Sequence, residues 1–416
     1  MMENSKIVRD PIHGDIKLSG IFVDLLETPE LQRLYNIKQL GFADLVFPGA
    51  HHTRLEHCLG VFWIASQIGD ALELDAGDCD LIKCAGILHD IGHGPFSHTL
   101  EAILLEKFGV DHVDLTEKLI LGEYSIFDSE ESTFIESENV CGVLDALGVD
   151  KKRVVDIIRG KVSEKPFLSQ ILNSSIDADQ LDYLIRDAYY TGVAFGMIDV
   201  ERFVQMLSVF DGNLVVKRKG VSSIENILMA RALMYSSVYF HKTVRIAELM
   251  LSKAIEQLVD PEPFEFFRMT DSEIISALKS KGGFQHEIIT RLKYRRLFKQ
   301  AYSVSLADLE DKSILGKLEN SGFRKGLEHE MEEAFGIPRG HVIIDVPRFE
   351  LMRAEPRINK TDIGVEDLGE VRSLDDFTPV AGAVRSRVAP DWALMVVTDE
   401  RYRDVVFRKA EKLLFA

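Results

Sequence analysis

The sequence of 416 residues has few cysteines, fewer basic than acidic side chains and no long apolar run. Its four cysteines, Cys58, Cys79, Cys84 and Cys141, include no C-x-x-C pair. This excludes a disulfide framework and indicates reduced thiols. No apolar run reaches membrane-spanning length, and residues 1–14 lack the apolar core of a signal peptide. We therefore expect a cytoplasmic protein without a membrane partner.

The shortage of basic residues limits the possible partners. Lys and Arg total 49 against 67 Asp and Glu, which gives a net charge of −18. A nucleic-acid coat or an anionic membrane surface requires a basic face, so neither is expected as the main partner. A small anionic substrate stays compatible with this charge, because it needs only a local basic pocket.

The spacing of apolar residues predicts a mainly α-helical protein. Helices are predicted over about 54–73, 78–91, 96–120, 177–190 and 224–258. A hairpin is predicted at about 207–218, around the turn sequence Asp211-Gly212-Asn213. The acidic, serine-containing stretch at about 122–140 is interpreted as a solvated insertion.

The pattern changes after about residue 260. Short helices are followed by two strand-like runs, at 341–346 and 392–397, and by a final helix that Thr398 is expected to cap. We predict a catalytic domain over residues 1–300 and a smaller α+β unit over residues 301–416.

The segment 86–98 holds three histidines and an aspartate, which are His89, Asp90, His93 and His98. His89 and Asp90 are adjacent, so on a helix their side chains project about 100° apart and can reach one ion. With His57 and an aspartate of the segment 177–182, they form a mixed nitrogen and oxygen ligand set. Such a set suits Zn, Fe, Mn, Co or Ni better than Mg. A lone histidine is more often structural, but the set His57, His89, Asp90, His93 and His98 favours a metal site.

Other spacings suggest where an anionic substrate binds. Arg54 lies one turn before His57, so a planar guanidinium emerges beside the proposed metal. The alternative is an exposed arginine at a helix start.

Further along, two cations and two phenols recur at i, i+4, i+8 and i+11. These residues are Arg231, Tyr235, Tyr239 and Lys242. Their stripe could be a solvated face, but two tyrosines favour a wall for a polyphosphate and a sugar.

Two more spacings point to chemistry. Asp179, Tyr183 and Asp187 follow at i, i+4 and i+8, which suits either a pocket or a solvated helix face. His98 and Glu101 are three residues apart, so the carboxylate can orient the imidazole as a general acid.

These motifs together resemble the HD-domain metal-dependent phosphohydrolases, and among them the deoxynucleoside triphosphate triphosphohydrolases. The resemblance covers about residues 6–300 and is carried by six stretches. They are Asp10-Pro-Ile-His-Gly14, Gln39-Leu-Gly41, Val46-Phe-Pro-Gly-Ala50, Arg54-Leu-Glu-His57, the segment His89 to His98, and the segment Asp177 to Asp187.

The resemblance implies roles for individual residues. The metal would be held by His57, His89, Asp90 and Asp179, with Asp177 as a second possibility. His93 and His112 would form a catalytic pair, and His98, backed by Glu101, would protonate the leaving group. The implied cofactor is a divalent transition metal, with Mg as a possible companion of the substrate phosphates.

The implied substrate is a deoxynucleoside triphosphate (dNTP). Arg54 would contact the α-phosphate, and Arg231 and Lys242 the phosphate tail. Gln39 and Asp187 would bind the 3′-hydroxyl, and Tyr239 would exclude a 2′-hydroxyl. Leu40, Tyr183 and Tyr235 would line the same site.

The sequence also departs from the family pattern. Gln180 stands where the family has a phosphate-binding lysine, and Val113 where a glutamate is usual. Glu27 and Tyr35 replace an aspartate and an arginine of the family's activator site.

We predict hydrolysis of dNTPs to a deoxynucleoside and tripolyphosphate by a homo-oligomer, a dimer or tetramer. The alternatives are another nucleotide phosphodiesterase or phosphomonoesterase, and a catalytically silent nucleotide-sensing scaffold.

Overall fold

The computed structural model describes residues 5–97, 103, 105, 109–127, 130–135, 137–257, 263–347, 363–387 and 391–415. The chain forms two compact units. Unit 1 comprises Met1–Met234, Glu262–Ser272 and Arg357–Arg385, and unit 2 comprises Tyr235–Pro261, Glu273–Pro356 and Ser386–Ala416. The predicted domain boundary at residue 300 stays a prediction. No helix among the described residues is long and apolar enough to cross a membrane.

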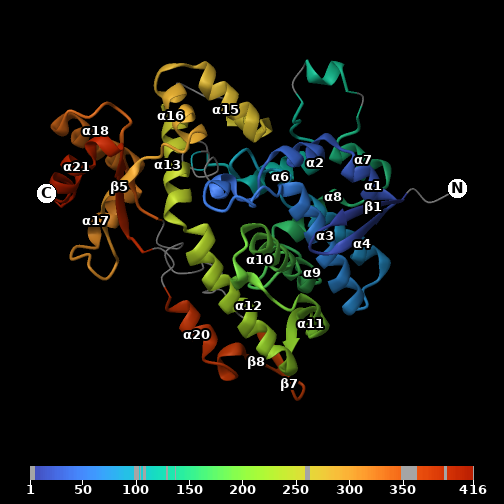
Figure 1. The fold of residues 1–416 in the computed structure, drawn as a ribbon. Coiled ribbons are helices and arrows are strands. Elements are labelled where there is room, and N and C mark those ends of the chain that lie inside the picture. Colours follow the sequence, from blue (N-terminus) through green and yellow to red (C-terminus); the bar gives the residue numbers. More distant parts are fainter. Residues whose placement is uncertain are drawn as a thin grey trace. The chain divides into compact units, whose positions relative to one another are not determined.

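Unit 1 is mainly helical, which confirms the predicted fold class (Figure 1). Its α-helices include α1 (Ile21–Leu26), α2 (Pro29–Arg33), α3 (Arg54–Ala71), α4 (Ala76–Leu88), α6 (His112–Leu121), α7 (Val140–Ala146), α8 (Lys151–Ile158), α9 (Pro166–Gln170), α10 (Ala178–Thr191), α11 (Val200–Gln205), α12 (Val221–Met234), α14 (Pro263–Arg268) and α20 (Val380–Arg385). The predicted helices at 54–73, 78–91 and 177–190 correspond to α3, α4 and α10.

Helix α3 lies at the centre of unit 1, between α4 and α10. A Cβ at Gly86 would lie 3.3 Å from the carbonyl oxygen of Val61, so glycine lets α4 approach α3 closely. On the other side of α3, a methyl group at Gly60 would overlap the carboxylate of Asp182 on α10. Two glycines therefore bring three helices close together, and these helices carry the candidate metal ligands.

An N-terminal hairpin completes this packing. Strands β1 (Ser5–Asp10) and β2 (Gly14–Ser19) pair antiparallel. At the turn, Asp10 accepts hydrogen bonds from the backbone N–H groups of Ile12 and His13, at 2.9 and 2.8 Å. Its other oxygen accepts a bond of 2.7 Å from Arg186 on α10. The turn is thereby fixed to the same helix that carries Asp179.

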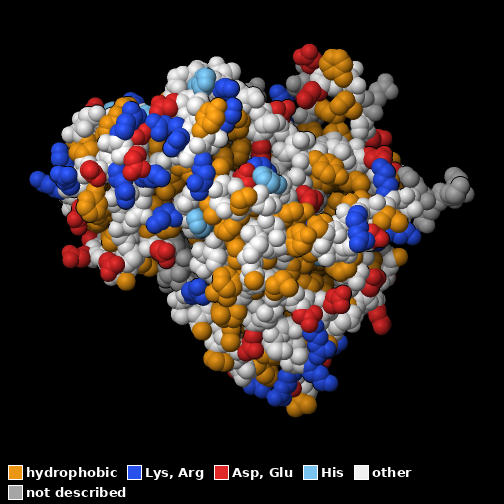
Figure 2. Space-filling model, in the orientation of Figure 1, with side chains coloured by type: hydrophobic (Ala, Val, Ile, Leu, Met, Phe, Trp, Pro, Cys, Tyr) orange, Lys and Arg blue, Asp and Glu red, His pale blue; other side chains and the backbone are white. Residues whose placement is uncertain are grey.

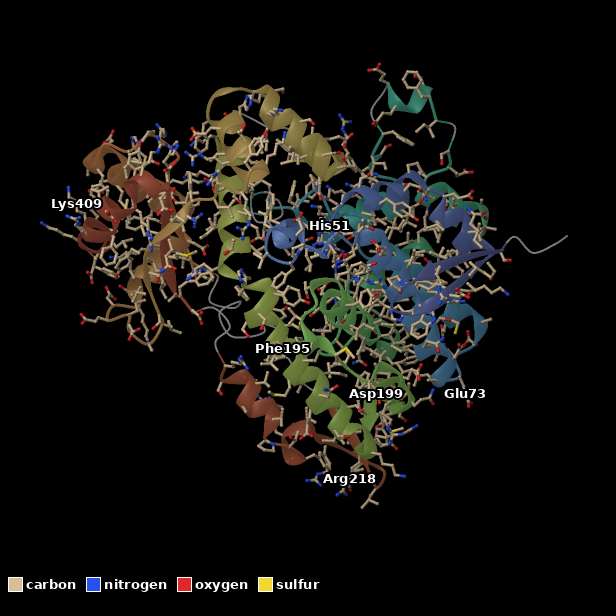
Figure 3. The ribbon with its side chains drawn as sticks, viewed as in Figure 1. His51, Glu73, Phe195, Asp199, Arg218 and Lys409 are labelled. Carbon is tan, nitrogen blue, oxygen red and sulfur yellow. The ribbon has the colours of Figure 1, made fainter. Side chains whose placement is uncertain are left out.

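The hairpin predicted at 207–218 forms as β3 (Leu207–Phe210) and β4 (Asn213–Lys217). The hairpin belongs to a larger sheet that the sequence did not predict, because β7 (Gly364–Asp367) pairs with β4 in parallel and β8 (Glu370–Ser373) follows. Arg218, labelled in Figure 3, donates to Asp367 at 3.0 Å and fastens this pairing. Periodicity within 207–218 holds no information about a partner strand some 150 residues later.

The helix predicted over 224–258 is interrupted. Helix α12 ends at Met234, a π-helical turn spans Tyr235–Tyr239, and α13 (Lys242–Glu256) begins after His241. A π-turn adds a residue per turn, so the regular spacing of Arg231, Tyr235, Tyr239 and Lys242 does not define one helical stripe. Arg231 belongs to unit 1, whereas the other three belong to unit 2.

The remainder of unit 2 is an α+β arrangement. Strand β9 (Leu394–Thr398) pairs antiparallel with β5 (Lys299–Val304) on one side and β6 (Val342–Asp345) on the other. The helices include α13, α16 (Gly283–Lys293), α17 (Ser313–Glu319), α18 (Ser321–Phe335), α21 (Arg403–Leu414) and most of α15 (Asp271–Ser280). The strands predicted at 341–346 and 392–397 are confirmed as β6 and β9.

One detail of this unit was predicted wrongly. Thr398 does not cap the final helix, because its hydroxyl donates to the carbonyl oxygen of His341 at 2.6 Å. Asp399 instead caps a 3-10 turn, Glu400–Tyr402, that precedes α21. Figure 2 shows Lys and Arg side chains gathered on the face over α18 and α21, so the net negative charge is not spread evenly.

Candidate metal centre

The first turn of α3 positions Arg54 and His57. Thr53 and Glu56 form a capping box, in which the Thr53 N–H donates to Glu56 at 2.6 Å, so the helix begins at Arg54. Arg54 and His57 are three residues apart and lie on one face. Both are almost fully buried, at 2% and 1% exposed.

His89 and Asp90 follow the last turn of α4. The Nδ1 atom of His89 lies 2.8 Å from the carbonyl oxygen of Gly86, which fixes the ring with its Nδ1–H as the donor. The Nε2 atom is buried and has no hydrogen-bond partner among the described residues. Metal-binding histidines are held in this way, with one nitrogen bonded to the protein and the other facing the ion.

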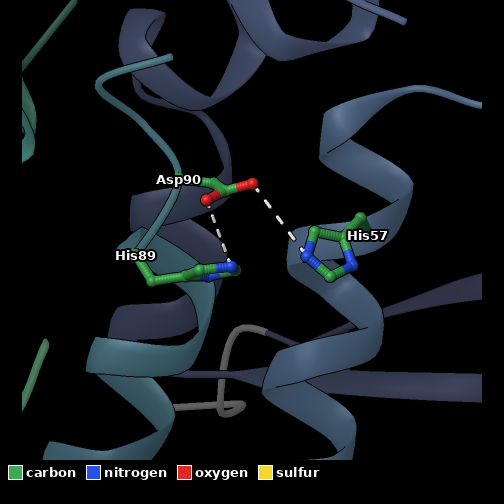
Figure 4. A group of neighbouring side chains, drawn as sticks. All are labelled: His57, His89 and Asp90. Atoms are coloured by element: carbon green, nitrogen blue, oxygen red, sulfur yellow. Dashed lines mark ion pairs between the residues drawn. The ribbon is translucent and has the colours of Figure 1, made fainter. Parts of the chain in front are cut away.

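Four side chains converge at this point, and Figure 4 shows three of them. Asp90 lies 3.3 Å from His89 Nε2 and 3.9 Å from His57 Nε2. Asp179, near the start of α10, lies 3.1 Å from His57 Nε2 and 4.0 Å from His89 Nε2. Ligand atoms about 2.1 Å from one ion are roughly 3 to 4 Å apart. The donor set and the unpartnered Nε2 atom therefore fit a divalent metal.

The other candidate aspartate has a different position. Asp177 is the N-cap of α10 and accepts from the backbone N–H of Gln180 at 3.0 Å. It also accepts from the N–H of Ser174 at 3.2 Å. The capping role occupies Asp177, while Asp179 is the aspartate within reach of His57.

Asp182 supports His57 from behind. It is fully buried and lies 2.8 Å from His57 Nδ1 and 2.7 Å from His13 Nε2. Arg186 donates to both of its oxygens, at 2.8 and 3.0 Å. The sequence analysis included Asp182 only among the candidate ligand aspartates and gave His13 and Arg186 no role, although the i, i+4 spacing of Asp182 and Arg186 and the histidine of Asp10-Pro-Ile-His-Gly14 were available signals.

Electrostatics favour a cation here. Burial lowers the pKa of His57, but hydrogen bonds to Asp179 and Asp182 outweigh it and raise the pKa to about 10. For Asp90, burial raises the pKa, but its basic neighbours, among them His89 and Arg54, hold it well below its usual range. Asp90 is thus ionised, as is Asp182, whose pKa Arg186 also holds well below its usual range against the effect of burial.

His93 and His112, which were predicted to form a catalytic pair, lie in contact. Their rings are stacked with centroids 3.9 Å apart, and His93 Nε2 lies 3.3 Å from Asp90. Burial, with the positive charges of Arg54 and His112, lowers the pKa of His93 to about 3, so its ring is neutral. Arg33 fixes this segment by donating to the carbonyl oxygens of Ile91 and His93, at 3.0 and 2.7 Å. His98 and Glu101 lie outside the described residues.

Arg54 connects the metal ligands to a potential anion site. Its Nε donates to Ser97 at 2.5 Å, and one terminal nitrogen pairs with Asp90. The other, Nη2, is buried without a hydrogen-bond partner among the described residues. A guanidinium with an unused buried N–H next to a metal site can bind a phosphate oxygen.

The residues assigned to the sugar lie near one another. Gln39, followed by Leu40, donates its backbone N–H to the carbonyl oxygen of His52 at 3.0 Å. His52 Nε2 lies 2.7 Å from Asp187, which is buried on α10. Tyr183, on the same helix, is half-buried. His52 was not among the predicted site residues.

The residues assigned to the phosphate tail are divided between the units. Arg231 is fully buried in unit 1 and donates to the carbonyl oxygen of Ser175 at 2.7 Å and to the side-chain oxygen of Gln180. Tyr235, Tyr239 and Lys242 lie in unit 2, where the two tyrosine rings meet edge to face at 5.1 Å. Their part in the site stays a prediction.

Comparison with known proteins identifies the family of the chain. The model of the HD domain matches residues 54–187, and that of the HD associated region matches residues 198–415. A solved structure of a phosphohydrolase from Bacteroides thetaiotaomicron has a TM-score of 0.72 at 26% identity, covering 96% of this chain and all of that one.

Two curated relatives extend the comparison. An uncharacterized protein of Methanocaldococcus jannaschii is 31% identical over 397 residues, 94% of this chain and 78% of its own length. The deoxynucleoside triphosphate triphosphohydrolase SAMHD1 of Gallus gallus is 32% identical over 282 residues, 61% of this chain. The match spans 45% of that relative, less than half of its length. With these matches and the His57, His89 and Asp90 cluster, the chain belongs to the HD-domain family of metal-dependent phosphohydrolases.

Proposed function

We propose that the chain hydrolyses dNTPs at the α-phosphorus, releasing a deoxynucleoside and tripolyphosphate. The observation that carries the proposal is the position of Arg54. Its buried guanidinium pairs with Asp90, a candidate metal ligand, and has an N–H group left for a further acceptor. A phosphate oxygen is the acceptor that both a metal and a guanidinium bind well.

His57, His89, Asp90 and Asp179 would hold the metal. When bound, such a metal lowers the pKa of a water and polarises a phosphoryl oxygen. Arg54 would bind the same phosphoryl group, and its fixed position would stabilise the charge that spreads over the phosphate oxygens.

The chain's histidines would manage the protons. His93 is neutral and in contact with Asp90, so its ring can accept a hydrogen bond near the reacting group. His112 stacks on it and limits its rotation. His98, backed by Glu101, is proposed to protonate the departing 5′-oxygen, as the family resemblance implies.

Gln39 and the buried Asp187 would select a sugar. Both link to His52, and a 3′-hydroxyl placed between them would donate its one hydrogen to the carboxylate of Asp187 and accept from the side-chain amide of Gln39, which has a buried atom without a partner among the described residues. Leu40 and Tyr183 would form the walls of this part of the site. The named activity of the SAMHD1 relative supports a dNTP as the substrate.

The triphosphate tail would be bound by Arg231 and Lys242, with Tyr235 and Tyr239 beside the nucleotide. Gln180, at the position of the family's lysine, accepts a hydrogen bond from Arg231. The guanidinium thus brings a positive charge to the place where the family uses an ammonium. This contact supports a phosphate site despite the departure from the family pattern.

One experiment separates the alternatives. The purified chain is analysed for bound metals and then incubated with the four dNTPs, the four NTPs and cyclic nucleotides. Tripolyphosphate and deoxynucleoside from dNTPs alone support the proposal. Orthophosphate or a ring-opened cyclic nucleotide would indicate a phosphomonoesterase or phosphodiesterase, and binding without product would indicate a sensing scaffold.

A variant tests the role of Arg54. Replacement Arg54→Lys keeps the charge but cannot contact Ser97, Asp90 and a phosphate oxygen together. We expect metal content to be retained and kcat/KM for dNTPs to fall by about 100-fold, in the range seen when one transition-state contact is removed. Unchanged kcat/KM would contradict the assignment.

A further inference from the structure

The loop before α3 is attached to the C-terminal half of α10 through His52. The His52 ring is 2% exposed, and its Nε2 lies 2.7 Å from Oδ1 of Asp187. The ring also stacks on Tyr190, with centroids 4.5 Å apart and planes 17° from parallel. A Cβ at Gly49 would lie 2.6 Å from the carbonyl oxygen of Tyr190, so the loop approaches the helix as closely as glycine allows.

The same residue holds Gln39. Its carbonyl oxygen accepts the Gln39 N–H at 3.0 Å. His52 therefore contacts both residues proposed to bind the 3′-hydroxyl, one through its backbone and one through its ring.

Two buried atoms in this group have no hydrogen-bond partner among the described residues, His52 Nδ1 and Gln39 Oε1. Buried polar atoms are nearly always hydrogen-bonded. Their occurrence on adjoining residues points to a polar group of a ligand that binds here.

We infer that His52 is a positioning residue that holds Asp187 and Gln39 ready for the 3′-hydroxyl of a deoxynucleotide. The inference rests on the proposed function and adds the residue that sets the preference for that hydroxyl. With Nε2–H donating to Asp187, the carboxylate is held in one orientation before the substrate arrives. An acceptor held in place binds a hydroxyl without first losing its own rotational freedom.

A purely structural role for His52 predicts a different result when the residue is replaced. Stacking on Tyr190 and filling the space beside Gly49 would be retained by a phenylalanine, which cannot hydrogen-bond to Asp187. A glutamine places an amide N–H near the position of Nε2. The variants H52F and H52Q therefore separate packing from hydrogen bonding, and Y190F, which removes only the bond from Tyr190 to Glu56, is the matched control.

The test compares each dNTP with its 2′,3′-dideoxy counterpart. Equilibrium binding to the full chain is measured in EDTA, which removes the metal, and kcat/KM is measured with Mn²⁺. In the unaltered chain we expect the 3′-hydroxyl to strengthen binding by about tenfold or more, the value of a hydrogen bond to a charged group. H52F should lose most of this preference with dideoxynucleotide binding unchanged, and H52Q should keep part of it. Y190F should keep all of it.

Each result bears on the inference. An unaltered chain that binds both nucleotides equally, or neither, overturns it, and so does an H52F variant that weakens both nucleotides to the same degree. If H52F does not fold, as judged by its thermal transition, H52N replaces it, because its shorter amide does not reach Asp187. A chain that prefers the 3′-hydroxyl but releases no tripolyphosphate contradicts the proposed function and leaves the result on His52 intact.

Discussion

The Nδ1 atom of His57 lies 2.8 Å from Oδ2 of the fully buried Asp182. This contact assigns the proton to Nδ1 when a metal is bound, and so leaves the lone pair of Nε2 for the ion. Arg186 neutralises Asp182 and also donates a hydrogen bond to Asp10. The orientation of His57 therefore depends on a network that reaches the N-terminal hairpin.

Replacing Asp182 by asparagine should weaken metal binding by about 10- to 100-fold, the usual effect of removing a group that orients a ligand. It should also destabilise the fold by about 3–5 kcal/mol, because Arg186 loses one of its two buried carboxylate partners and keeps only Asp10. Metal affinity is measured by competition with a chelating dye, and stability by urea unfolding.

Asp199→Asn is the control for that change. Asp199, labelled in Figure 3, caps α11 by accepting from the N–H of Arg202 at 3.0 Å, and asparagine caps a helix equally well. We expect both metal affinity and stability of this variant to match the unaltered chain. A D182N protein with normal metal affinity would show that the His57–Asp182 contact is not needed for the site.

Gly60→Ala should be destabilising by about 1–3 kcal/mol, because the added methyl group overlaps Asp182 and α10 must move away from α3. The same movement separates His57 from Asp179, so metal affinity should fall as well. Gly316→Ala, on the exposed side of α17 with no atom within 4 Å of the new methyl group, should instead stabilise by about 0.5–1 kcal/mol. Equal unfolding midpoints for G60A and G316A would rule out the close packing described at Gly60.

The parts of the site that sequence predicted are those encoded by short-range spacing. Arg54 and His57 lie one turn apart on a helix with a clear start, and His89 and Asp90 are adjacent, so their local geometry follows from helix periodicity. Asp182 and Arg186 follow the same periodicity, but their respective partners, His13 and Asp10, come from about 170 residues earlier. Only the folded chain shows that these residues meet.

The interruption after Met234 could not be predicted. The segment 235–241 contains neither proline nor glycine, so nothing in its composition marks a break, and a π-turn keeps an apparently helical pattern. The prediction of one stripe from Arg231 to Lys242 assumed an uninterrupted α-helix. The π-turn changes the helical phase within this segment, so the prediction did not hold. The partner strands β7 and β8 were missed because strand pairing over such a distance depends on tertiary contacts.

Stability should depend on Asp399 in acid. Burial opposes ionisation of this carboxylate, but hydrogen bonds from Arg401 and the charge of Arg291 outweigh it and lower the pKa to about 2. Since the folded-state pKa lies below the unfolded value of about 3.9, the contribution is complete above pH 4 and is lost as the pH falls towards 2. Asp399→Asn should thus be less stable than the unaltered chain at pH 6, and the difference should shrink between pH 4 and pH 3. A difference that is constant with pH would show that the charge of Asp399 does not contribute.

Gln180 is one of the positions where this chain and the family pattern differ in charge. Its contact with Arg231 predicts the effect of restoring the family's lysine. Gln180 is 1% exposed and Arg231 is fully buried, so Gln180→Lys places two positive charges side by side without water. We expect a loss of about 3–5 kcal/mol in urea unfolding. Adding Arg231→Gln removes the repulsion and should recover most of the loss, with a coupling energy of about 0.5–3 kcal/mol between the two sites.

Gln205→Lys, at an exposed position of α11, controls for the added charge and should leave stability within about 0.5 kcal/mol. If Q180K is as stable as the unaltered chain, the guanidinium of Arg231 does not occupy the place of the family's lysine, and its assignment to the phosphate tail fails with it.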